Sequence, residues 1–66
     1  MSKVAQFLGK HPGVDGYTLI CVLDEISRRV HVSADTLLSV ALVDSKAADF
    51  LIRTVAKLEP KAVLND

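Results

Sequence analysis

The chain has little of what stabilises most domains of its size. Its 66 residues include one cysteine, so no disulfide can form within the chain, and only 5% of the residues are aromatic. A chain this short forms one domain with a thin core. Small domains are commonly stabilised by disulfides, a metal or a partner subunit. Since Cys21 has no partner, we expect either very good helix packing or oligomerisation.

An excess of charge, long apolar runs and an export signal are also missing. Eight basic and eight acidic residues balance, which counts against a strong nonspecific polyanion binder. No segment reaches the roughly 18 consecutive apolar residues of a membrane span. The N-terminus lacks the features of a signal peptide, and a single free cysteine suits a reducing compartment. We therefore expect a cytoplasmic protein that does not bind membranes.

Groups that could perform catalysis or bind a metal are scattered. His11 and His31 lie twenty residues apart with Cys21 between them, which does not match the ligand spacing of metal sites. The adjacent carboxylates of Asp24 and Glu25 diverge by about 100° on a helix. No glycine-rich phosphate loop is present. We expect no enzymatic activity, no metal and no cofactor.

Half of the residues are apolar, and their spacing predicts helices. Apolar positions recur at three- and four-residue intervals between turns. We expect helices over residues 2–10, 16–30, 34–43 and 45–59, with N-caps at Ser2, Asp15, Ser33 and Asp44 or Ser45. Residues 17–23 have a strand alternative, because Tyr, Thr, Ile and Val favour strands. The helical period that continues through Ile26 and Val30 favours helix.

The sequence therefore predicts an all-α fold, a compact bundle of about four short helices. Residues 1–60 would form a single helical domain and residues 61–66 a short C-terminal tail. On the last helix, Asp49 and Arg53 have the spacing of an ion pair. The expected inward faces are Val4, Phe7 and Leu8; then Leu19, Val22, Leu23, Ile26 and Val30; then Leu37, Val40 and Ala41; and finally Ala47, Ala48, Leu51, Ile52, Val55 and Leu58.

Residues 23–42 meet the packing needs of two helices joined by a tight turn. The first helix has an apolar face, a small residue at the crossing and an apolar residue in the turn: Leu23, Ile26 and Val30, then Ser27, then Val32. The second helix has Ser33 as a cap, with Leu37 and Val40 as apolar anchors. This segment resembles the helix-turn-helix of bacterial and phage repressors. The resemblance implies a small regulatory protein that binds DNA.

Two features depart from that family's pattern. His31 stands where the turn usually has a left-handed glycine, a conformation that histidine adopts at some cost. Base-reading residues are absent from the expected outer face of the second helix, which carries Ala34, Asp35, Leu38, Ser39 and Leu42. The candidate DNA contacts are Arg28, Arg29, Ser33, Thr36, Ser39 and Lys46, and most of them would touch phosphates.

A protein target is the alternative. Leu38 and Leu42, with Phe50, are expected to form an exposed apolar patch, and such patches mark interaction sites. If the helical phase differs, these three side chains belong to the core instead. Cys21 is expected to be a semi-buried or interface residue. We expect a homo-oligomer, first of all a dimer, and two functional hypotheses: a DNA-binding regulator, or an interaction module such as a small inhibitor, adaptor or antirepressor.

Overall fold

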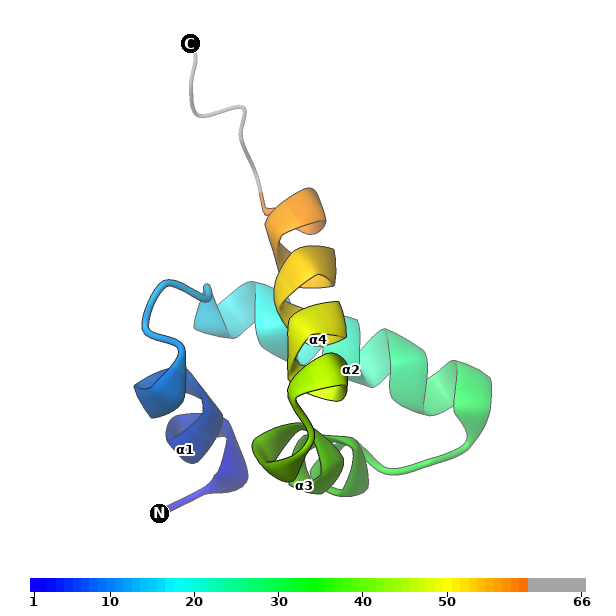
Figure 1. Cartoon of the computed structure of the whole chain (residues 1–66). Helices are drawn as coiled ribbons and strands as arrows, with labels where there is room; N and C mark the ends of the chain where they lie inside the picture. The colour runs from blue at the N-terminus through cyan, green and yellow to red at the C-terminus, as the bar shows by residue number, and fades with distance from the viewer. Residues whose placement is uncertain (60–66) are drawn as a thin grey trace, which may run out of the picture.

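Four helices follow one another in a computed structural model that describes residues 1–59 (Figure 1). They are α1 (Lys3–Lys10), α2 (Gly16–Val30), α3 (Ala34–Val43) and α4 (Ser45–Leu58). The described residues contain no strand, so the all-α prediction is confirmed, and helix is confirmed for residues 17–23. The expected tail, residues 61–66, lies outside the described residues.

Each helix begins at the polar residue that the sequence predicts as its cap. Ser2, Asp15 and Ser33 each accept a hydrogen bond from the backbone N–H three residues later, at 2.9–3.1 Å. Asp44, rather than Ser45, caps α4. These bonds satisfy backbone donors that a helix start would otherwise leave unpaired. Hydrogen bonds from the Thr18 hydroxyl and backbone also lower the pKa of Asp15.

The turn between α2 and α3 has a left-handed residue at its start. His31 has φ 58° and ψ 40°, and it is the only non-glycine residue with positive φ among those described. A left-handed residue reverses the chain directly after a helix, which is why glycine is favoured there. The turn spans residues 31–33 before α3 begins at Ala34. His31 therefore adopts the left-handed conformation that glycine usually supplies at this position.

The four helices enclose an apolar core, and α3 contacts each of the other three helices. Helix α1 lies beside α3, and α4 crosses α2 while also contacting α3 (Figure 1). Lys3 Nζ bonds Asp35 Oδ2 at 3.1 Å near one end of the α1–α3 contact, and Lys10 Nζ donates to the Leu42 carbonyl at 3.3 Å near the other. The buried apolar side chains are Phe7, Leu19, Val22, Leu23, Leu38, Ala41, Ala48, Leu51 and Val55.

The expectation that Leu38 lies on an exposed face is wrong. Leu38 is 2% exposed, and Leu42 is half-buried against the core. The cause is α1, which covers the side of α3 that a free helix-turn-helix would present to solvent. Helix α3 itself carries apolar residues on most of its sides. The spacing of these residues therefore does not show which side of the helix is buried.

Three residues expected to face inward are exposed instead. Val30, Val40 and Leu58 have exposed fractions of 51%, 47% and 62%. Val30 and Leu58 are the last residues of α2 and α4. Val40 is exposed because α1 and α4 contact other sides of α3. Leu38 and Val40 thus have the reverse of their expected positions, with Leu38 buried and Val40 exposed.

Candidate interaction surface

The short connection between α3 and α4 creates a groove. Asp44 alone separates the two helices. Its backbone N–H donates to the Val40 carbonyl at 2.9 Å, which closes α3, and its carboxylate accepts from Lys46 and Ala47, which opens α4. Helix α4 then runs away from the end of α3 and across α2 (Figure 1). The diverging helices leave an open space whose third wall is α2.

We call this space the α3–α4 groove. Its volume is about 260 Å³, and its lining contains no polar residue: Ile26, Leu37, Val40, Ala41, Ala47, Phe50 and Leu51. Val40 and Phe50 are 47% and 53% exposed. Covering apolar surface contributes about 25 cal/mol for each Å² removed from water. The groove therefore offers a partner a binding site whose free energy comes from apolar contact.

The two predicted arginine contacts are occupied by carboxylates of their own helix. Glu25 accepts from Arg28 Nη2 and from Arg29 Nε, both at 2.7 Å, and Asp24 lies 3.4 Å from Arg28 Nη1. The Arg29 and Arg28 hydrogen bonds lower the pKa of Glu25, and Glu25 in turn raises the pKa of Arg28. Two cations and two anions thus balance at the end of α2. This is a weak site for a polyanion.

The predicted hydroxyl contacts are also used within the chain. The Ser33 hydroxyl donates to Thr36 Oγ1 at 2.9 Å, and the Ser39 hydroxyl donates to the Asp35 carbonyl at 3.0 Å. Thr36 remains exposed on the outer side of α3. Lys46 is exposed at the start of α4, and the ten residues of α3 lie between it and the arginines along the chain. Apart from Lys46, the side chains of the six candidate DNA contacts therefore already take part in hydrogen bonds within the chain.

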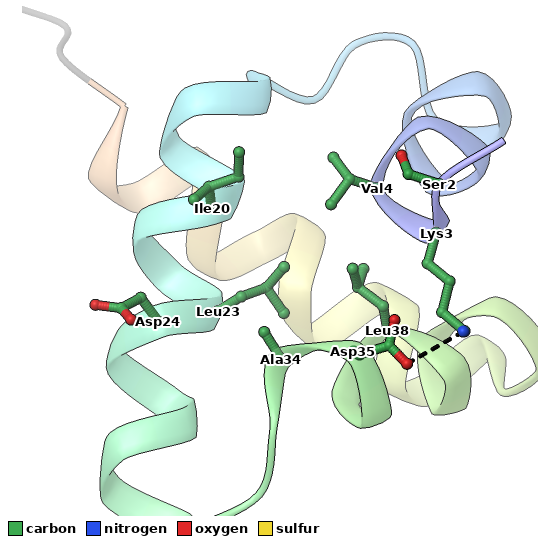
Figure 2. Close-up of a pocket in the computed structure, with 9 residues that line it drawn as sticks. All are labelled: Ser2, Lys3, Val4, Ile20, Leu23, Asp24, Ala34, Asp35 and Leu38. Carbon is green, nitrogen blue, oxygen red and sulfur yellow. Dashed lines mark hydrogen bonds and ion pairs between the residues drawn. The ribbon is translucent and has the colours of Figure 1, made fainter.

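A second groove lies between α1, α2 and α3, with a volume of about 360 Å³ (Figure 2). Leu23 and Leu38 form its buried floor, and Ile20, 53% exposed, stands at its α2 edge. The Lys3–Asp35 ion pair crosses from α1 to α3 on one side of it (Figure 2). This ion pair joins α1 to α3, so the charged groups of Lys3 and Asp35 are already paired with each other.

The predicted interface residue Cys21 is exposed on α2, away from the α3–α4 groove. It lines a third hollow, of about 240 Å³, with Tyr17 and Leu58 among its neighbours. Phe50 alone among the predicted interface residues lies at the groove. Sequence reasoning missed Val40 as a surface residue. The available signal was the amphipathic pattern of residues 3–10, whose apolar face has to pack against another helix. That helix is α3, and the packing leaves Val40 on an uncovered side.

The described residues contain no group of three or more side chains that could hold a metal ion. Within the same residues, none of the helices is long and apolar enough to cross a membrane. No protein-family model matches the chain, and comparisons with curated proteins and with solved structures give no match.

Proposed function

We propose that this protein is a small regulatory module that acts by binding a protein partner at the α3–α4 groove. The observation that carries the proposal is the wholly apolar lining of that groove, with Val40 and Phe50 half-exposed at its edges. A chain of 66 residues that leaves such side chains uncovered gains stability when another molecule covers them. Grooves of this kind commonly accept the apolar face of an amphipathic helix.

Selection of binders from a displayed library of random helical peptides tests the proposal. We expect peptides whose binding is lost in Phe50→Asp and kept in Ile20→Asp. The two variants are matched, because Phe50 and Ile20 are each 53% exposed, and Ile20 lines the other groove. Circular dichroism verifies that both variants fold. The proposal fails if no peptide binds, or if Phe50→Asp leaves binding intact.

DNA binding through the α2–α3 hairpin is the second candidate function. It is favoured by one observation, the three-residue turn with a left-handed His31 followed by a capped helix, as in helix-turn-helix proteins. Sedimentation with random duplex DNA at low salt tests it. This candidate predicts binding that weakens steeply with salt and is lost in Arg28→Gln/Arg29→Gln. Protein that sediments alone at low salt would exclude it.

A further inference from the structure

Basic side chains follow one face of α4 next to the α3–α4 groove. Lys46, Phe50, Arg53 and Lys57 are spaced by four, three and four residues, which places them on a single helix face. All four side chains are exposed. Phe50 also lines the groove, so the apolar site and the basic face adjoin one another.

The three cations of this face differ from the others in residues 1–59. Lys3, Lys10, Arg28 and Arg29 each bond an oxygen of the chain. Lys46, Arg53 and Lys57 form no ion pair or side-chain hydrogen bond within the described residues. The expected pairing of Asp49 with Arg53 is absent among those ion pairs. The cations without a partner among residues 1–59 therefore share the α4 face that adjoins the groove at Phe50.

The combination of these two surfaces identifies the chemistry of the partner. A partner that fills the groove must present apolar side chains, and one that also covers the α4 face must present negative charge. A nucleic acid supplies the charge, but its bases would meet a lining without hydrogen-bonding side chains. Base edges buried there would lose hydrogen bonds to water without replacement. The observations favour a protein segment over a nucleic acid.

We propose that the partner of this protein is an acidic amphipathic helix. Its apolar face lies in the α3–α4 groove beside Phe50, and carboxylates at one edge of that face pair with Lys46 and Arg53. Seven residues of helix, about 10 Å, separate these two cations, so the carboxylates lie about two turns apart on a helix parallel to α4. This inference rests on the proposed function, because it names the partner class for the same groove.

A second displayed library of helical peptides, with apolar positions fixed and flanking positions randomised among Glu, Lys, Gln and Ser, tests this inference. We expect Glu to be enriched on one edge of the selected peptides. Lys46→Gln/Arg53→Gln should weaken their binding about 3- to 10-fold, the range expected of two exposed ion pairs. Arg28→Gln/Arg29→Gln removes the same charge at the end of α2 and should leave binding unchanged. Added salt should reduce the difference between the two variants.

The other outcomes separate the two proposals. Peptides that need Phe50 but carry Gln, Ser or Lys at the flanking positions would overturn the acidic partner and leave the proposed function standing. The same holds if both double variants bind the selected peptides equally. Absence of any selected peptide would overturn both proposals. Low-salt binding of single-stranded or duplex DNA that is lost in Lys46→Gln/Arg53→Gln would assign the basic face to nucleic acid and overturn the inference.

Discussion

Replacing Leu38 and Val40 separately with alanine tests which face of α3 is buried. Leu38 is 2% exposed, and a buried Leu→Ala change costs about 2–5 kcal/mol. Because an open groove adjoins Leu38, its neighbours can relax, and we expect a loss of about 3 kcal/mol. Val40 is 47% exposed, and alanine has the higher helix propensity. For Val40→Ala we expect a change of less than about 1 kcal/mol.

Urea unfolding followed by circular dichroism measures both changes. With a slope of about 1 kcal/mol per M urea for a small domain, Leu38→Ala should lower the midpoint by about 3 M and Val40→Ala by less than about 1 M. Measurement at two protein concentrations identifies any contribution of self-association. A loss for Val40→Ala equal to or larger than that for Leu38→Ala would refute the packing of α1 against α3.

Three further predictions concern the turn at His31, the helix caps and the ion pairs of α2. His31→Gly should stabilise the protein by about 1 kcal/mol in thermal unfolding, because glycine tolerates φ 58°; Glu59→Gly, at φ −62°, should not. Ser33→Ala should cost about 1 kcal/mol in urea unfolding by removing the α3 cap; an unchanged midpoint would contradict that role. The pKa values of Asp15 and Glu25 are lowered in the folded state, so their contribution to stability is present at neutral pH and is lost as the pH falls below about 4.5. Melting temperatures measured from pH 7 to pH 3 should show that loss, and Glu25→Gln should reduce it.

The elements of this fold could be predicted from the sequence because their signals are local. A capping side chain bonds a backbone group three residues away, so Ser2, Asp15 and Ser33 mark helix starts without any knowledge of the tertiary structure. The turn at His31 is local in the same sense. Regular apolar spacing over residues 16–30 likewise distinguished helix from strand in α2.

The candidate site could be predicted only in part, because it depends on how helices pack against one another. Helix α3 carries apolar residues on most sides, and which of them are exposed is decided by where α1 and α4 lie. Leu38 was therefore expected outside and Val40 inside, the reverse of the structure. The exposure of Phe50 was expected correctly, because Phe50 breaks the strong amphipathic pattern of α4. The lack of partners at Lys46 and Arg53 depends on side-chain geometry that spacing does not determine.

Nuclear magnetic resonance is the decisive test of whether the α3–α4 groove binds a protein segment. Amide chemical shifts of ¹⁵N-labelled protein would be recorded during titration with a peptide selected from the library. We expect the largest shifts around Leu37, Ala47 and Leu51, which line the groove, and we expect Phe50→Asp to abolish them. Shifts centred instead on the turn at His31 or on the groove beside Ile20 would contradict the claim.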